Sequence, residues 1–293
     1  MVELPDLTSF RSLRRYLEEN KLQPRRSMGQ NFLVDRNIAV KIIDAAGLKE
    51  GEPVVEIGPG AGALTAVLAR RSLPVVAVEL DRGLAAALKK LLRSRPNVSV
   101  LQEDALKINW NTLLKRHFPP GSGATLISNL PYNISTPLLY SLYKQGFPFK
   151  KAILTFQKEV ALRLTAEPGG NYGALTVLSR YYAQLEILFP ISRSSFWPQP
   201  EVDSAVVAIT PRRRRELGAD EEAFFWRIVQ AAFQQRRKMI VNSLRPLGFG
   251  SRSELVSFLR SAGIDPADRA EALSAAQFAK IARIAYNRTS KTS

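Results

Sequence analysis

Apolar runs and helical stretches alternate along the first half of the chain. Five runs have the continuous apolar character of strands that are buried on both faces, at 53–57, 75–80, 98–101, 124–128 and 151–156. Between them, apolar residues recur at helical spacing over 64–71, 83–93, 137–145 and 158–166. Alternation of this kind predicts an α/β domain that is doubly wound around a largely parallel sheet.

Further elements precede and follow this alternation. An amphipathic helix is predicted at 7–20 and a second helix at 36–46, with Asp35 as its expected cap. The runs 175–183, 185–191 and 205–210 are expected to add antiparallel strands. Later periodicity is helical only, over 221–235, 237–244, 252–261 and 275–287. The sequence thus predicts a catalytic domain with an N-terminal extension at 1–210, and a small all-helical domain at 211–293.

Composition narrows the functional classes. The 293 residues include 42 Lys and Arg against 26 Asp and Glu, and the net charge of +16 indicates a polyanionic partner such as nucleic acid. The absence of cysteine excludes disulfides, thiolate metal sites and cysteine nucleophiles. The single histidine, His117, is expected in a solvated loop with no role, and no metal site is expected. No apolar run approaches the length of a membrane span, so a cytoplasmic protein is expected.

A glycine-rich turn follows the first strand of the alternation, with the sequence Glu56-Ile57-Gly58-Pro59-Gly60-Ala61-Gly62-Ala63-Leu64-Thr65. Glycines let the backbone approach a ligand closely, as nucleotide cofactors require. Glu79 ends the second strand, where a carboxylate can accept hydrogen bonds from both ribose hydroxyls. Together, the glycine-rich turn and Glu79 favour an adenosine-containing ligand. The spacing also fits a dinucleotide, so the cofactor stays open at this point.

Two later strand ends carry further acceptors. Asp104 follows the third strand and is placed either to accept from the amine of the cofactor's adenine or to cap a helix. Asn129-Leu130-Pro131-Tyr132 follows the fourth strand. An asparagine oxygen and a backbone carbonyl can accept both hydrogens of a planar amine, while the tyrosine ring covers one face. These residue types are suited to acting on a nucleobase.

A proline-rich loop, Phe196-Trp197-Pro198-Gln199-Pro200-Glu201-Val202-Asp203-Ser204, lies between two predicted strands. Prolines hold such a loop extended, so Phe196 can be presented rigidly as a surface on which an extruded base stacks. The alternative is a core aromatic beneath the loop. Two basic segments, Arg212 to Arg215 and Arg236-Arg237-Lys238, are interpreted as contacts to the phosphates of a nucleic acid.

Three other functional classes can be compared with the residues of this chain. A nicotinamide-dependent oxidoreductase would need a proton donor or acceptor near its cofactor, and neither histidine, cysteine nor a Tyr-x-x-x-Lys pair stands at such a place. DNA adenine methyltransferases usually carry an acidic residue or a second proline where this chain has Asn129-Leu130. A non-catalytic RNA-binding assembly factor is a third alternative, against which the intact Glu79, Asp104 and Asn129 argue.

Taken in order, these motifs resemble those of the ribosomal RNA adenine dimethyltransferases, and most of all the bacterial small-subunit branch associated with kasugamycin resistance. The resemblance begins near Arg26, includes Gly29-Gln30-Asn31-Phe32-Leu33 and extends through the helical C-terminus. Two positions depart from it: Met28 stands where leucine is common, and Glu201 where lysine is frequent. The related macrolide-resistance enzymes of large-subunit RNA share most motifs, but the helical C-terminus and the complete Gln30-to-Leu33 segment favour the small-subunit branch.

The resemblance implies a Rossmann-like fold, S-adenosylmethionine as cofactor with no metal, and dimethylation at N6 of two adjacent adenosines near the 3′ end of 16S ribosomal RNA. The partner would be this RNA in the small subunit or its precursor, bound by a monomer. The cofactor would be bound by Asn31, Leu33, Gly58, Glu79, Asp104 and Asn129. Asn129, Tyr132 and Phe196 would hold the target adenine, and the Asn129 side chain and the Pro131 carbonyl would accept its amine hydrogens.

Overall fold

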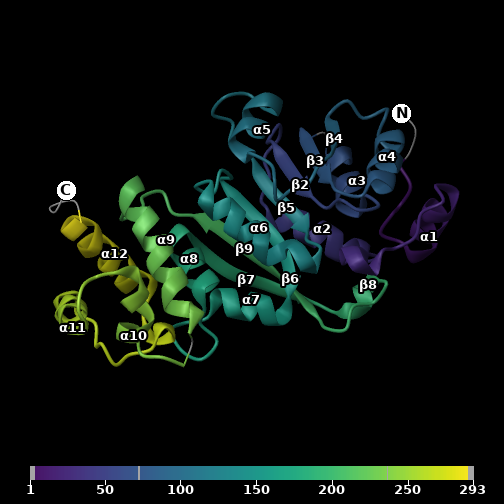
Figure 1. The fold of residues 1–293 in the computed structure, drawn as a ribbon. Helices are drawn as coiled ribbons and strands as arrows, with labels where there is room; N and C mark the ends of the chain where they lie inside the picture. Colours follow the sequence, from purple (N-terminus) through teal and green to yellow (C-terminus); the bar gives the residue numbers. More distant parts are fainter. Residues whose placement is uncertain (1–3, 72, 236, 290–293) are drawn as a thin grey trace. The chain divides into compact units, whose positions relative to one another are not determined.

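Residues 4–71, 73–235 and 237–289 are described by a computed structural model (Figure 1). The chain divides into two compact units. Unit 1 comprises Met1–Ala161 and Leu185–Pro211, and unit 2 comprises Leu162–Gln184 and Arg212–Ser293. The division differs from the expected one at 210/211, because residues 162–184 group with the C-terminal helices.

A seven-stranded mixed sheet forms the centre of unit 1 (Figure 1). Its order is β4 (Val98–Gln102), β3 (Val75–Glu79), β2 (Val54–Ile57), β5 (Thr125–Asn129), β6 (Lys151–Gln157), β9 (Ser204–Pro211) and β7 (Ala183–Ile191). Neighbours from β4 to β6 run parallel, and β9 runs antiparallel to β6. The predicted doubly wound α/β domain is confirmed, with the carboxyl ends of the parallel strands at one edge.

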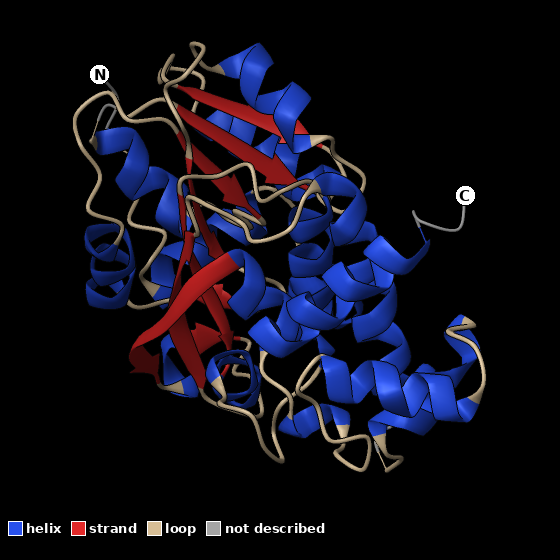
Figure 2. Ribbon diagram, turned by 90° about the vertical axis from the view of Figure 1, so that its left-hand side faces the viewer, coloured by secondary structure: helices blue, strands red, loops and turns tan. Residues whose placement is uncertain are grey.

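Helices connect the parallel strands, and Figure 2 shows the red strands lying between blue helices. They are α3 (Ala63–Arg70), α4 (Arg82–Leu91), α5 (Trp110–His117) and α6 (Tyr132–Lys144). The helices α1 (Phe10–Glu19) and α2 (Arg36–Ala45) precede the first parallel strand, and α7 (Lys158–Thr165) follows the last. The predicted cap of α2 is confirmed: Asp35 Oδ1 accepts the N–H groups of Asn37 and Ile38 at 3.0 and 3.1 Å.

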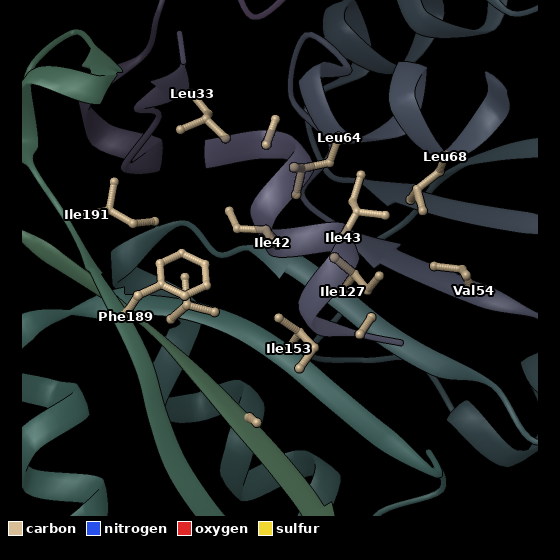
Figure 3. Packing of buried hydrophobic residues seen from close by; sticks show 14 of the residues in the cluster. Leu33, Ile42, Ile43, Val54, Leu64, Leu68, Ile127, Ile153, Phe189 and Ile191 are labelled. Carbon is tan, nitrogen blue, oxygen red and sulfur yellow. The ribbon is translucent and has the colours of Figure 1, made fainter. Parts of the chain in front are cut away.

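A large hydrophobic cluster fixes α2 and α3 against the sheet (Figure 3). Ile42 and Ile43 of α2 are fully buried with Leu68 of α3 and Ile127 of β5. Each such side chain contributes about 1.5–3 kcal/mol of burial free energy. Leu33 belongs to the same cluster, so the hydrophobic effect also anchors the segment before α2 beside the strand ends.

That segment is further held by a two-stranded sheet. β1 (Phe32–Leu33) pairs antiparallel with β8 (Phe196–Trp197), and Val34 N–H donates to Ser195 O at 2.8 Å. Thus the N-terminal motif and the proline-rich loop meet at the strand-end edge of unit 1.

One predicted strand is wrong. Of the predicted strand 175–183, residues 175–182 lie in a helix, α8 (Ala174–Tyr182), and β7 begins only at Ala183. Val177, Tyr181 and Tyr182 are residues that favour strands, and most of α8 is buried, so its sequence lacks a polar stripe. A helix that is buried nearly all round has the same continuous apolar pattern as a buried strand.

Three helix boundaries also differ from the prediction. His117 is not in a loop but ends α5, where Lys115, Arg116 and His117 lie favourably at the negative end of the helix dipole. α6 begins at Tyr132 and contains Pro137, which was expected to start it. The helix predicted at 237–244 is shorter, so Arg237 and Lys238 precede α10.

Unit 2 is helical within the described residues. Besides α8 it contains α9 (Ala219–Gln234), α10 (Ile240–Leu244), α11 (Arg252–Ser261) and α12 (Ala275–Thr289). Short 3-10 segments in the two units are η1 (Arg26–Met28), η2 (Arg193–Ser195), η3 (Arg245–Leu247) and η4 (Ala270–Ala272). Tyr181 of α8 packs on Phe225 of α9 with ring centroids 4.4 Å apart. Over the described ranges, no helix is both long and apolar enough to span a bilayer.

Candidate active site

A cavity of about 280 Å³ opens at the carboxyl ends of β2, β3 and β5, all within unit 1. This is where ligands bind in open α/β sheets. Eight of the nine residues that the sequence assigns to cofactor or target adenine line it: Asn31, Leu33, Gly58, Glu79, Asp104, Asn129, Pro131 and Tyr132.

The glycine-rich turn forms the floor of this cavity. Gly58 has a φ of +63°, and a Cβ there would lie 2.9 Å from Pro131 Cδ. Gly60, with a φ of +59°, would bring a Cβ to 3.0 Å from the Phe32 ring. Glycine is therefore required for both backbone conformation and space, and the turn packs directly against the motif at the end of β5.

Glu79 is held firmly at the end of β3. Its Oε2 accepts the N–H of Gly60 and its Oε1 accepts the N–H of Asp81, each at 2.9 Å. Burial raises the pKa of this carboxyl, and the two N–H donors oppose that rise. Each oxygen keeps a further lone pair, so the carboxylate is preoriented to accept from a diol.

Glu56 lines the same cavity, although no role was predicted for it from the sequence. Its carboxyl is 2 % exposed and its Oε2 accepts from Thr65 Oγ1 at 2.7 Å. Burial raises its pKa to about 8, and the charge of Glu79 adds to that rise. The signal in the sequence was an acidic residue inside an otherwise apolar strand. Burying a carboxyl there costs free energy, and such residues usually belong to a functional site.

Asp104 lines the cavity beyond β4, and it does not cap a helix. Its Oδ1 accepts the N–H of Leu106 at 3.0 Å within a turn, and its Oδ2 lies 3.7 Å from Lys107 Nζ. The helix that follows, α5, is capped by Asn109 instead. The turn bond holds the Asp104 carboxylate in place, and its expected contact with the cofactor's adenine stays a prediction.

Asn129 is tied to the N-terminal segment. Its Nδ2 donates to the carbonyl of Asn31 at 3.2 Å, and Asn31 Nδ2 donates to Gly29 O at 3.3 Å. With Nδ2 engaged, the Oδ1 of Asn129 is the atom left to accept a hydrogen bond. The end of β5 and the segment before β1 thus form one wall of the cavity.

Pro131 and Tyr132 begin α6. The carbonyl of Pro131 accepts the N–H of Ile134 at 3.1 Å, which leaves one of its two lone pairs for the amine contact that the sequence predicts. Leu130, which precedes it, also lines the cavity and brings a second backbone carbonyl to this turn. The Tyr132 hydroxyl and Ser204 Oγ are hydrogen-bonded at 2.7 Å, which ties the ring to β9.

Phe196 is the one predicted residue that the structure does not bring to the site. Its side chain is 3 % exposed and packs in the hydrophobic cluster with Leu33, and it does not line the cavity. Pairing of β8 with β1 turns it inward, as in the core-aromatic alternative. The neighbouring Trp197 is partly exposed and meets Phe10 edge to face at 5.5 Å.

The predicted RNA-contacting residues lie in unit 2 and are exposed where described. These are Arg212, Arg213, Arg214, Arg215, Arg237 and Lys238, whereas Arg236 lies outside the described residues. Arg215 is paired with Glu222 at 3.0 Å. Within the described ranges, His, Asp and Glu form no cluster of three that could hold a metal ion.

The cavity suits an adenosine-bearing cofactor. It combines a glycine turn for close backbone approach, a fixed carboxylate at Glu79 for a diol and the Asp104 carboxylate for an amine. Its volume lies near the lower end of small-molecule pockets, which hold about 300–1,000 Å³.

Similarity to known proteins places the chain in a family. The family described as "Ribosomal RNA adenine dimethylase" matches residues 21–287. "Ribosomal RNA small subunit methyltransferase A" of Moorella thermoacetica is 45% identical over 272 residues, which cover 91% of this chain and 94% of that protein. The protein of the same description from Pelotomaculum thermopropionicum is 44% identical over 277 residues, covering 92% and 94%.

Two solved structures have similar folds. A dimethyladenosine transferase from Plasmodium falciparum superposes with a TM-score of 0.72 at 27% identity, covering 88% of this chain and 98% of that one. The 23S rRNA methyltransferase ErmE has a TM-score of 0.64 at 27% identity, covering 87% and 99%. The Rossmann-like methyltransferase fold expected from the motifs is confirmed, and the chain belongs to the ribosomal RNA adenine dimethylase family of S-adenosylmethionine-dependent methyltransferases.

Proposed function

We propose that this enzyme dimethylates N6 of two adjacent adenosines near the 3′ end of 16S ribosomal RNA. The curated relatives named above, at 44–45% identity, are described as small-subunit enzymes. The observation that carries the proposal is that the Asn129 amide, with its oxygen left to accept, shares one cavity with the Glu79 carboxylate. The Asn129 amide is suited to binding an amine, and the Glu79 carboxylate is suited to binding a ribose.

S-adenosylmethionine supplies the reaction with an electrophilic methyl group on a sulfonium. On this chain, Glu79 would accept from the two ribose hydroxyls and Asp104 from the amine of the cofactor's adenine. The positive φ of Gly58 lets the backbone approach the ligand, and Asn31 and Leu33 also line the cavity.

The target amine is a weak nucleophile because its lone pair is delocalised into the adenine ring. Asn129 Oδ1 would accept one of its hydrogens, and a backbone carbonyl of the Leu130–Pro131 turn would accept the other. Acceptors in this arrangement favour a pyramidal nitrogen, whose lone pair can attack the methyl group. Alignment within the cavity would supply the remainder of the rate. As the bond from nitrogen to methyl forms, the bond from methyl to sulfur would break and leave a neutral thioether. The methylated amine would then lose its proton to water, so no side chain is assigned as general base.

The remaining predicted site residues have supporting roles in this proposal. Tyr132, fixed by Ser204, would cover one face of the target base. Stacking on Phe196 would require the side chain to leave the hydrophobic cluster, because it is buried there. Arg212 to Arg215, Arg237 and Lys238 would contact RNA phosphates.

The fold of ErmE, whose description names 23S rRNA, makes large-subunit RNA the second candidate substrate. The experiment is transfer of labelled methyl groups to unmethylated small and large subunits in parallel, followed by nucleoside analysis. N6-dimethyladenosine in small-subunit RNA is expected. Label confined to large-subunit RNA would overturn the substrate and keep the chemistry, and no label on either would overturn the activity. A cytoplasmic monomer acting on small subunits or their precursors belongs to the same proposal.

A further inference from the structure

A second cavity, of about 270 Å³, lies entirely within unit 2. Its walls come from the segment before α8, from α8 itself, from the chain that follows β9 and from the start of α12. None of its lining residues belongs to the active-site cavity.

Arginines dominate the charge of this cavity. Arg180, Arg212, Arg214 and Arg215 line it, against the two carboxylates of Glu167 and Glu216. The lining therefore carries an excess of positive charge. Anions are favoured in such a concave, cationic pocket.

Three of the four arginines are engaged and one is available. Arg212 Nε donates to the carbonyl of Arg180 at 3.0 Å. Arg180 donates to the carbonyls of Ala166 and Thr165, each at 2.9 Å, and its Nη2 lies 2.6 Å from Glu167 Oε1. Arg215 is engaged by Glu222. Arg214 is exposed and forms no ion pair with any residue in the described ranges.

The first turn of α12 opens onto the same cavity. Ser274 Oγ accepts the N–H of Gln277 at 3.3 Å, which caps the third position of the helix. The N–H groups of Ala275 and Ala276 have no acceptor with hydrogen-bond geometry among the described residues, and both residues line the cavity. The N-terminus of a helix of 15 residues attracts anions through such free donors and its dipole.

A buried hydroxyl points independently to a missing ligand. Tyr172 is 1 % exposed and lines the cavity, yet its hydroxyl has no hydrogen-bond partner within the described part of the chain. Burial raises its pKa, whereas the charge of Arg180 and the N–H of Ala275 lower it. The hydroxyl therefore faces these two cavity-lining groups, and its approach to Ala275 falls short of hydrogen-bond geometry. Buried polar atoms without a partner are uncommon and call for one.

We propose that this cavity binds a phosphate group of a nucleotide. The phosphate oxygens would accept from the N–H groups of Ala275 and Ala276, from the Tyr172 hydroxyl and from the Arg214 guanidinium. A nucleotide phosphate has two sources with this shared chemistry, an RNA backbone or a free nucleotide. The RNA source rests on the proposed function, and the free nucleotide does not.

Three variants of the full-length protein test the site, each with little expected effect on folding. Ala275→Pro removes one free N–H, and proline is well tolerated at the first position of a helix. Tyr172→Phe removes only the hydroxyl, and Arg214→Gln removes the available guanidinium. Arg252→Gln is the matched control, because it makes the same change in charge at an exposed position of unit 2 that does not line the cavity. Circular dichroism melting checks that each variant folds.

Two probes separate the sources. The first is a fluorescent single-stranded RNA, titrated with the enzyme at several salt concentrations. The second is uridine monophosphate, whose binding is followed by the broadening of its phosphorus NMR line. A uridine nucleotide is used because the active site is expected to bind adenine. For RNA, Arg214→Gln and Ala275→Pro should each lower affinity about three- to tenfold, with Arg214→Gln reducing the salt slope by about 1. Arg252→Gln should change affinity less than about twofold.

The outcomes decide the site and its source. Loss of RNA affinity in the three cavity variants but not in Arg252→Gln supports the site with RNA as its ligand. Loss of uridine monophosphate binding with unchanged RNA affinity supports it with a free nucleotide. Equal effects of Arg252→Gln and Arg214→Gln, or no effect on either probe, would overturn it. Methyl transfer is measured in a separate assay. If the proposed function fails there, the binding results for the two nucleotide probes can still be interpreted.

Discussion

The side-chain amide of Asn129 donates a hydrogen bond to the backbone carbonyl of Asn31 across 3.2 Å. This bond joins the end of β5 to the segment before β1 and orients Asn129 so that its oxygen is the atom left for a ligand. The residue proposed to act on the target amine is thus positioned by the segment proposed to hold the cofactor.

Asn129→Ala is expected to reduce turnover by at least about 100-fold while changing cofactor affinity less than about tenfold, because its amide acts mainly on the transition state. Single-turnover methyl transfer and calorimetry with S-adenosylhomocysteine measure the two effects. Asn111→Ala, at an exposed position of α5, is the control and should behave as wild type. Equal losses of turnover and affinity would remove the proposed role of Asn129 in the chemical step.

Glu79→Gln should weaken cofactor binding about 10- to 100-fold with a smaller effect on turnover at saturation. Glutamine keeps the size of the side chain but exchanges one acceptor oxygen for an amide that donates, and buried charged acceptors form the stronger hydrogen bonds. Calorimetric titration with S-adenosylhomocysteine provides the measurement. An unchanged dissociation constant would rule out the ribose contact.

Gly58→Ala should destabilise unit 1 and abolish cofactor binding. A left-handed backbone costs an alanine about 1–2 kcal/mol, and here the added Cβ also meets Pro131 Cδ at 2.9 Å. Gly47→Ala is a matched control, because Gly47 also has a φ of +63° but an added Cβ would have no atom within 4 Å. Urea unfolding should show a larger loss for Gly58→Ala than for Gly47→Ala. Equal losses would mean that the contact with Pro131 is not tight.

The pKa of Glu56, about 8 in the folded protein, predicts a pH-dependent stability. Unfolding lowers it to an ordinary carboxyl value, so between about pH 5 and 8 the folded state binds the proton and the unfolded state does not. Stability from this group is greatest at low pH and falls, by up to about 1.4 kcal/mol per pH unit, until the folded pKa is passed. Glu56→Gln should flatten this dependence in urea unfolding at pH 5, 6, 7 and 8. Parallel profiles for the two proteins would contradict the prediction.

Tyr132→Phe should lower stability by about 1 kcal/mol, since it removes one partner of the hydrogen bond to Ser204. Methyl transfer should be largely kept, because the ring and not the hydroxyl covers the target base. Tyr132→Ala should lose activity at least about tenfold more than Tyr132→Phe. Equal activity of the two variants would show that the ring does not contact the base.

Much of the fold follows from patterns that are local in the sequence. The parallel strands are continuous apolar runs, and Asp35 precedes a helix as capping residues do, so both were predictable. α8 was not, because burial on nearly all sides removes the periodicity that distinguishes a helix from a strand.

The site was predictable only as far as it depends on strand ends. The carboxyl ends of parallel strands lie at one edge of the sheet, however the loops pack. This arrangement brings together Gly58, Glu79, Asp104 and Asn129. Rotation of Phe196 into the core depends on the pairing of β8 with β1, and engagement of the Pro131 carbonyl depends on where α6 begins. Both are consequences of tertiary packing that no local pattern encodes.

The pairing of β1 with β8 also sets a limit on the order of folding. Phe32 and Leu33 emerge early in synthesis, whereas their partners Trp197 and Phe196 emerge near the end of unit 1. The bridge that anchors the wall containing Asn31 therefore cannot form until about two-thirds of the chain has left the ribosome. A nascent chain that stops short of β8 has the glycine turn and the parallel strands. It lacks the β1–β8 pairing that anchors the cavity wall around a ligand.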